Sequence, residues 1–117
     1  NFGGDLLALG PQDGDRPWRV GIESLAGDSA AAKQIDLRVG ALATSGDARR
    51  FLLRDGKRYS HILDPTTGWP VVGGPRSVTV AAPSCTQAGM LATLALLRGR
   101  DAETFLAAEG AQYWALR

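Results

Sequence analysis

The sequence predicts an α+β fold, a mixed α/β sandwich in which a predominantly antiparallel sheet is packed by two helices. Short segments alternate apolar and polar residues with a period of two, which is typical of strands with one buried face. Asp55-Gly56 between two apolar segments is a strong short-range signal for a β-hairpin. Strands outnumber helices without strict alternation, which favours this class over a doubly wound parallel sheet.

The first part of the chain is predicted to form strands joined by polar loops. Residues 6–9 are an apolar run closed by Gly10-Pro11, and we expect a short buried strand there. Residues 18–25 alternate and form a second strand. The small and polar residues 26–33 are expected to be a loop. Residues 34–44 carry apolar side chains at period two and are predicted as one strand, which ends in a turn at 43–47.

The middle of the chain is predicted to hold a hairpin and a long loop. Residues 51–53 and 59–63 flank Arg54-Asp55-Gly56-Lys57, so His61 is expected on the return strand. Residues 66–76 contain two prolines and three glycines and are predicted to be irregular. Residues 77–82 form a further strand that Pro83 stops.

The clearest predicted helix runs from Ser84 to Leu97. Ser84 as N-cap and Gln87 three residues later match a capping box. The segment is apolar almost all round, so we expect this helix to be buried rather than amphipathic. Asp101 is predicted to cap a shorter helix from Ala102 to Glu109, and residues 112–116 to form the last strand.

Size and composition indicate one folded domain, residues 1–117. The chain has 44% hydrophobic and 21% charged residues, which is ordinary for a globular protein. A net charge of +1 gives no electrostatic argument for nucleic acid or an anionic membrane as partner. No apolar run approaches the roughly 20 residues of a membrane span. Because the chain begins at Asn1 without a methionine, we expect it to be a piece of a longer protein.

A single cysteine and a single histidine limit the possible chemistry. Cys85 alone cannot form an internal disulfide or a cysteine-based zinc site. It is predicted to be a partly buried helix residue rather than a nucleophile. His61 precedes Asp64-Pro65 and Gly68, and these turn residues predict a tight loop at the end of a strand. A catalytic role is plausible there, but on the local pattern alone a surface or capping histidine is favoured.

Five segments of the chain resemble, in the same order, segments of the ApbE family, the FAD:protein FMN transferases. Each motif is weak by itself, and their order makes the resemblance specific. The resemblance covers essentially the whole chain and identifies it as similar to the C-terminal part of an ApbE-like flavin transferase domain. The five segments are Asn1 to Asp5, Trp18 to Ile22, Ala43 to Asp47, Ser60 to Pro70, and Ser77 to Val80 continued by the helix with Leu91-Ala92-Thr93.

The resemblance implies an activity, partners and a location. The family cleaves FAD at its pyrophosphate and moves FMN to a threonine or serine hydroxyl of a target protein, with magnesium, while some members only bind or hydrolyse FAD. Phosphoryl transfer suits a metal enzyme, since catalysis is mostly positioning and neutralisation of charge. The expected partners are therefore FAD, Mg²⁺ and a target protein. Family members are often exported to the bacterial cell envelope or periplasm, and a cytoplasmic location stays open.

The resemblance also implies site residues. His61 matches the family histidine that assists the acceptor hydroxyl. Ile62 and Leu63 lie where the family's chain passes the cofactor, with Leu63 the more probable contact. Thr93 and the carbonyl of Ala92 match metal-binding positions. Asp64 is expected to fix the loop rather than to react.

One departure from the family pattern is Gly89. The family places a metal-binding aspartate four residues before the threonine, on the same helix face, and this chain has glycine there. Glycine supplies no anionic oxygen, which magnesium prefers. Thr93 then has an alternative role, a hydroxyl bonded back to a helix carbonyl.

Three functional interpretations stay open. In the first, the chain is part of an active transferase whose missing N-terminal half is a separate chain or has been lost. In the second, it is a degenerate FAD-binding or interaction module. In the third, it is a structural domain that keeps only the fold. In each case we expect the isolated chain to be inactive. We also expect a dimer or a second chain, since half of such a fold would leave apolar faces exposed.

Overall fold

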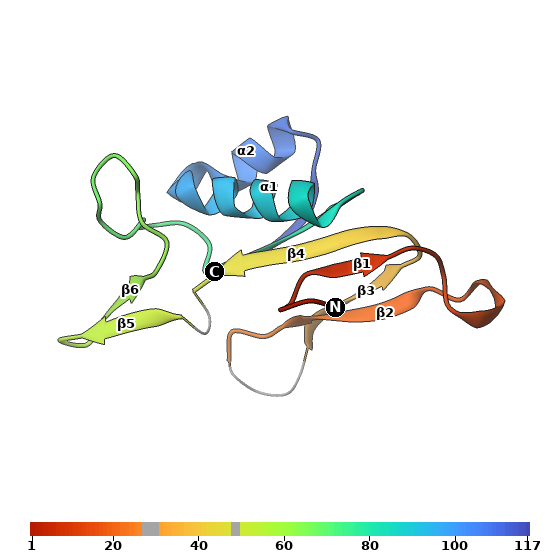
Figure 1. Ribbon diagram of the computed structural model, residues 1–117. Helices are drawn as coiled ribbons and strands as arrows, with labels where there is room; N and C mark the ends of the chain where they lie inside the picture. The colour runs from red at the N-terminus through yellow and green to blue at the C-terminus, as the bar shows by residue number, and fades with distance from the viewer. Residues whose placement is uncertain (27–30, 48–49) are drawn as a thin grey trace.

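The computed structural model describes residues 1–26, 31–47 and 50–117, and within them every strand pairing is antiparallel (Figure 1). The largest sheet has four strands in the order β1-β4-β7-β8. Two further sheets are two-stranded, β2-β3 and β5-β6. The strands are β1 (Leu6–Ala8), β2 (Trp18–Glu23), β3 (Ala31–Leu37), β4 (Gly40–Gly46), β5 (Phe51–Arg54), β6 (Lys57–Ser60), β7 (Ser77–Ala82) and β8 (Gln112–Leu116). The α+β class with a predominantly antiparallel sheet is confirmed.

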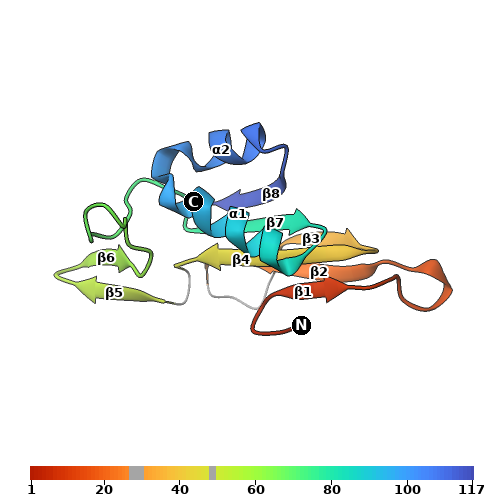
Figure 2. The ribbon, with the colours of Figure 1, turned by 45° about the horizontal axis from the view of Figure 1, so that its top comes forward.

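Two α-helices cover one face of the four-stranded sheet (Figure 2). Helix α1 (Cys85–Leu97) packs on β4 and β7, and α2 (Ala102–Ala108) packs on α1 and β8. Short 3-10 turns occupy Asp13–Asp15 (η1) and Gly99–Asp101 (η2). Neither α-helix in the described ranges is long and apolar enough to cross a membrane.

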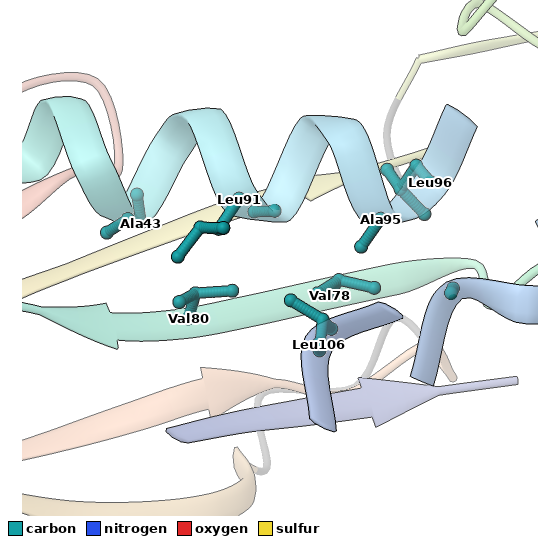
Figure 3. Close-up of a cluster of buried hydrophobic side chains, with 10 residues drawn as sticks. Ala43, Val78, Val80, Leu91, Ala95, Leu96 and Leu106 are labelled. Atoms are coloured by element: carbon teal, nitrogen blue, oxygen red, sulfur yellow. The ribbon is translucent and has the colours of Figure 1, made fainter. Parts of the chain in front are cut away.

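The main core lies between the helices and the sheet (Figure 3). Val78 and Val80 alternate along β7, so both face the helices, and both are fully buried. Leu91, Ala95 and Leu106 close the cluster from the helix side. Burying a valine or leucine side chain is worth about 1.5–3 kcal/mol. This cluster is the larger of the two buried clusters in the described part of the chain.

A smaller core lies on the opposite face of the sheet, against the β2-β3 ribbon. Leu42 of β4 and Leu37 of β3 are buried there, with Trp114 packed at the edge. Thr44 and Thr79 are cross-strand partners whose hydroxyls lie 2.8 Å apart. Helices, sheet and ribbon therefore form successive layers, as the predicted sandwich requires.

The prediction of one strand over residues 34–44 is wrong, because the chain breaks at Arg38-Val39. Strand β3 pairs with β2, whereas β4 pairs with β1 and β7 in another sheet. Gly40 has φ +104, and a Cβ there would lie 3.1 Å from the carbonyl oxygen of Ala82. The predicted turn at 43–47 is also wrong for residues 43–46, because they belong to β4, which ends at Gly46. Of the predicted loop 26–33, residues 27–30 lie outside the described residues, and 31–33 belong to β3.

The helices differ from expectation in their outer faces and ends. Ser84 caps α1 as predicted, since its hydroxyl accepts a bond of 3.2 Å from the Gln87 amide. However, α1 is not buried all round, because Met90 and Leu94 are 54% and 40% exposed on the face turned away from the sheet. Asp101 makes no side-chain capping bond, and α2 ends one residue earlier than predicted.

The predicted hairpin is confirmed. Asp55 and Gly56 have φ of 51 and 72, the pair of positive values that a type I′ turn requires. Strand β6 ends at Ser60, so His61 lies one residue beyond the strand and not on it. The first predicted strand is also only partly buried: Ala8 is buried, whereas Leu9 is 88% exposed. The hairpin projects from one end of the molecule (Figure 1).

Candidate functional site

The loop after β6 is built around Asp64. Its Oδ1 accepts bonds from the backbone amide and the hydroxyl of Thr66, at 2.8 and 2.6 Å. Its amide donates to the Trp69 carbonyl and its carbonyl accepts from the Gly68 amide, both at 2.8 Å. Gly68 adopts φ +71, which favours glycine. The sequence-based expectation that Asp64 fixes the loop agrees with these bonds.

The same bonds shift the titration of this carboxyl. Hydrogen bonding from the Thr66 hydroxyl, followed by that from the Thr66 amide, lowers the pKa of Asp64 below its ordinary value. Donors that bond to the charged form favour it. At neutral pH Asp64 is therefore an anion, and its hydrogen bonds hold the loop.

His61 lies at the start of this loop and is exposed to solvent. Its Nδ1 lies 2.9 Å from the carbonyl oxygen of Arg50. Because a carbonyl oxygen can only accept, Nδ1 carries a proton and donates it in this contact. In the neutral ring the lone pair is then on Nε2, which is the atom that can take a proton from a substrate.

Ile62 and Leu63 present different surfaces. Ile62 is half-buried and packs against the main core, and its amide and carbonyl already bond to Ser60 Oγ at 3.1 Å and the Val71 amide at 3.0 Å. Leu63 is 52% exposed. Leu63 therefore offers the free apolar surface of the two, and the cofactor contacts of both residues stay predictions.

An ion cluster beneath the loop was not predicted from the sequence. The Asp47 carboxylate, 14% exposed, lies 3.3 Å from Arg58 Nη2 and 3.5 Å from Arg76 Nε. Arg58 also stacks on Phe51, with its Cζ 3.5 Å from the ring centroid. The cluster joins the end of β4, strand β6 and the segment before β7, and it lines a cavity of about 210 Å³ together with Ile62. The sequence did not predict these pairs, because Arg58 and Arg76 lie 11 and 29 positions from Asp47.

The predicted metal-binding residues lie on α1. Thr93 faces β4, where its Oγ1 lies 2.7 Å from Ser45 Oγ, and Ala92 is fully buried. Ser45 is a second hydroxyl that sequence reasoning did not assign to the site. A Cβ at Gly89 would lie 3.8 Å from the Ala43 Cβ, an ordinary contact, so the glycine is not required by packing there.

These α1 residues do not fit a magnesium ion without further ligands. The donors near Thr93 are the two neutral hydroxyls, and glycine stands at the expected carboxylate position. Within the part of the chain that the structure describes, no group of three His, Cys, Asp or Glu residues could hold a metal ion. Magnesium usually binds through one or two carboxylates and keeps several waters. The metal roles of Thr93 and Ala92 stay predictions.

The loop and α1 are linked through the core. Ile62 packs against the cluster that contains Ala92, so the segment that carries His61 rests on the buried side of the helix that carries Thr93. The structural class is an antiparallel α+β sandwich in which a histidine-bearing loop lies beside a pair of hydroxyls, Thr93 on α1 and Ser45 on β4. The chain belongs to the ApbE family, whose family model matches residues 1–115.

Curated relatives support this membership. The chain is 42% identical over 102 residues to the FAD:protein FMN transferase of Vibrio cholerae, which covers 86% of this chain and 30% of that protein. It is 36% identical over 102 residues to the Haemophilus influenzae protein of the same name, with the same coverage. The chain thus spans about a third of the length of these relatives.

Solved structures share the fold. The ApbE protein of Thermotoga maritima has a TM-score of 0.84 at 39% identity, over 97% of this chain and 37% of that one. The apo flavinyl transferase ApbE of Pseudomonas stutzeri has a TM-score of 0.82 at 33% identity, over 100% of this chain and 37% of that one. The predicted ApbE-like fold is confirmed.

Proposed function

We propose that this chain is the His61-bearing portion of an FAD:protein FMN transferase. The complete enzyme moves FMN from FAD to a threonine or serine hydroxyl of a target protein. Family membership and the printed names of the relatives support flavin transfer. The observation that carries the role of this chain is the bond from His61 Nδ1 to the Arg50 carbonyl, which leaves Nε2 as the proton acceptor.

In this proposal His61 acts as a general base. Nε2 accepts the proton of the acceptor hydroxyl, whose oxygen attacks the FMN-side phosphorus of FAD. A new phosphoester bond forms, the pyrophosphate P–O bond breaks, and AMP leaves. A positioned base contributes typically 10²–10⁴-fold to such a step. Asp64 and Thr66 hold the loop, while the exposed Leu63 provides apolar contact to the flavin nucleotide.

A magnesium ion bound to the complete enzyme would supply charge neutralisation at the phosphates. Thr93 and the Ala92 carbonyl would contribute neutral oxygens, and the anionic ligands would have to come from elsewhere. We therefore infer that a second chain, or a further part of the same protein, completes the metal site and the flavin pocket.

A second candidate is a non-catalytic FAD-binding module. Gly89 in place of an acid, together with the neutral Ser45–Thr93 pair, favours it. In that case His61 would be a binding residue only.

Labelled-flavin transfer tests the two candidates. The purified chain is incubated with labelled FAD, Mg²⁺ and a target domain with an acceptor threonine, alone or with the N-terminal part of the Vibrio cholerae relative as a separate chain. We expect no transfer by the chain alone and transfer by the mixture, lost in His61→Ala. Transfer by the chain alone would contradict our assignment. No transfer by the mixture, with FAD still bound, would favour the non-catalytic module.

A further inference from the structure

A groove of about 680 Å³ runs between the His61 loop and the end of α1. Its lining contains four cationic side chains and one acid, Asp64. The cations are Lys57, Arg58, Arg98 and Arg100. Such an imbalance is unusual in a chain whose net charge is only +1.

Glycines build the groove by allowing close backbone approach. A Cβ at Gly74 would lie 3.0 Å from the Gly99 carbonyl oxygen, and one at Gly99 would lie 3.1 Å from that of Val72. A Cβ at Gly73 would lie 2.9 Å from Arg100 Nε, so the arginine side chain lies across this glycine. The loop is thereby packed directly on the turn that carries the arginines, which lies beside it at the end of α1 (Figure 2).

The cations are available to a ligand. Arg58 is paired with Asp47, but among the described residues Lys57, Arg98 and Arg100 form no ion pair with a carboxylate. Lys57 and Arg98 lie over the rings of Tyr59 and Phe105, at 5.5 and 5.3 Å from the centroids. The charged ends themselves lie over these ring faces, and Lys57, Arg98 and Arg100 are all exposed to solvent.

The groove also has an aromatic wall. Trp69 is 70% exposed and lines it together with Tyr59. Tryptophan, tyrosine and arginine are the side chains enriched at the energetic centres of protein–protein interfaces. Cations and exposed aromatic surface together fit a polypeptide with acidic side chains.

A nucleotide fits this groove less well. Backbone amides at helix N-termini are a common phosphate-binding device, whereas the positive charge of this groove, at the C-terminal end of α1, comes from side chains alone. Several long cationic side chains spread along the groove can each pair with a carboxylate of an extended segment. Asp64 is three residues from His61, so such a segment would pass close to the proposed base.

We propose that this groove docks an acidic segment of the target protein next to its acceptor hydroxyl. The proposal rests on the proposed function, because it places the target beside His61. The charges steer the segment to the loop, and Trp69 contributes apolar contact.

Peptide binding to the whole chain tests the docking without any transfer. The probes are a fluorescein-labelled peptide with aspartates and glutamates around one threonine, and a matched peptide with asparagines and glutamines instead. Binding is followed by fluorescence anisotropy at low and high salt. The variants are the double change Arg98→Gln with Arg100→Gln, Trp69→Ala, and the matched control Arg19→Gln with Lys33→Gln on the separate β2-β3 ribbon.

We expect the acidic peptide to bind at least about tenfold more tightly than the amide peptide, with the difference reduced by salt. The double arginine variant and Trp69→Ala should each lose most of this binding, and the control should keep it. Equal binding of the two peptides, or an equal loss in the control, would overturn the proposal. If the arginine variant does not fold by circular dichroism, Lys57→Gln with Trp69→Ala replaces it.

FAD binding by the same variants distinguishes a failure of the docking proposal from a failure of the proposed transferase function. We expect flavin fluorescence to report unchanged FAD affinity in the groove variants. Loss of FAD affinity together with displacement of the peptide by AMP would make the groove a nucleotide site and overturn the docking proposal. Peptide discrimination in a chain that binds no FAD would support the docking surface and count against the proposed function instead.

Discussion

At the residue scale, the best-defined group is Asp64. Its pKa is lowered by the Thr66 hydroxyl and amide, so its contribution to stability is present above the unfolded-state pKa. That contribution is lost as the pH falls through the folded-state pKa. The loop that carries His61 should therefore keep its order throughout the neutral range and lose it only in acid.

Thr66→Val should raise the pKa of Asp64, because it removes the hydroxyl that is the largest cause of the shift. An NMR pH titration of the Asp64 side chain measures this directly. Thr104→Val, at an exposed position of α2, is the matched control and should leave it unchanged. An Asp64 titration that is identical in wild type and Thr66→Val would show that this hydroxyl does not hold the loop.

Gly89→Asp should restore a metal ligand. The added Cβ meets only Ala43, at 3.8 Å, and the carboxylate joins Thr93 on adjacent turns of α1. In the complete protein, where the further ligands are present, we expect Mg²⁺ affinity to rise on the order of tenfold, about 1.4 kcal/mol, by titration calorimetry. Gly89→Asn is the neutral control. An Asn variant that binds as tightly as the Asp variant would refute a role for charge, and no gain in either would show that position 89 is not at a metal site.

Residue identity predicted some of the site and not the rest. His61 and Thr93 were found because they lie within recognisable motifs. Ser45 and the arginine partners of Asp47 were missed because their contacts join residues 48, 11 and 29 positions apart, which no local pattern encodes.

At the element scale, the hairpin β5-β6 depends on contacts with the body of the molecule. A two-stranded hairpin is marginally stable by itself, and here Leu52 and Leu53 are 63% and 65% exposed. The ion cluster of Asp47, Arg58 and Arg76 ties β6 to β4 and β7. His61 follows β6 directly, so its position depends on this cluster.

Asp47→Asn should loosen the hairpin. Removing one partner of a largely buried charged pair costs on the order of 1–3 kcal/mol, here offset in part by the remaining amide. Amide hydrogen exchange should become faster in β5 and β6 and stay slow in β8. Asp36→Asn is the control, because Asp36 pairs with Arg19 at the exposed surface, 3.9 Å apart. Unchanged exchange in β6 would contradict the positioning role.

The elements show where local sequence is sufficient. The Asp55-Gly56 hairpin, strand β7, the Ser84 cap and strand β8 were predicted well, since each rests on turn chemistry or capping within a few residues. The break between β3 and β4 was missed because apolar residues continue at period two across it. The approach of Gly40 to Ala82 of β7, which favours glycine just after this break, joins residues far apart in sequence and is not visible in the local pattern.

At the scale of the whole molecule, apolar surface stays exposed in several regions. Met90 and Leu94 lie on the outer face of α1, while Phe2 and Leu9 are 92% and 88% exposed near β1. Burial was predicted from apolar runs for Met90, Leu94 and Leu9, because a sequence does not show which side of an element meets the core. Their exposure agrees with our proposal that a further segment or chain completes the enzyme.

FAD binding by the purified chain, followed by flavin fluorescence with and without Mg²⁺, tests the central claim most directly. We expect FAD to bind, with an affinity that His61→Ala and Leu63→Ala reduce and that Mg²⁺ changes by less than about threefold, a difference below 1 kcal/mol. Arg19→Gln, at an exposed position of strand β2, is the control that should leave the affinity unchanged. Strong Mg²⁺ dependence in the wild-type chain would contradict the conclusion that Gly89 leaves the metal site incomplete. No FAD binding, either by the chain alone or by its mixture with the N-terminal part of the Vibrio cholerae relative, would contradict the assignment of a flavin-binding role to the His61 loop.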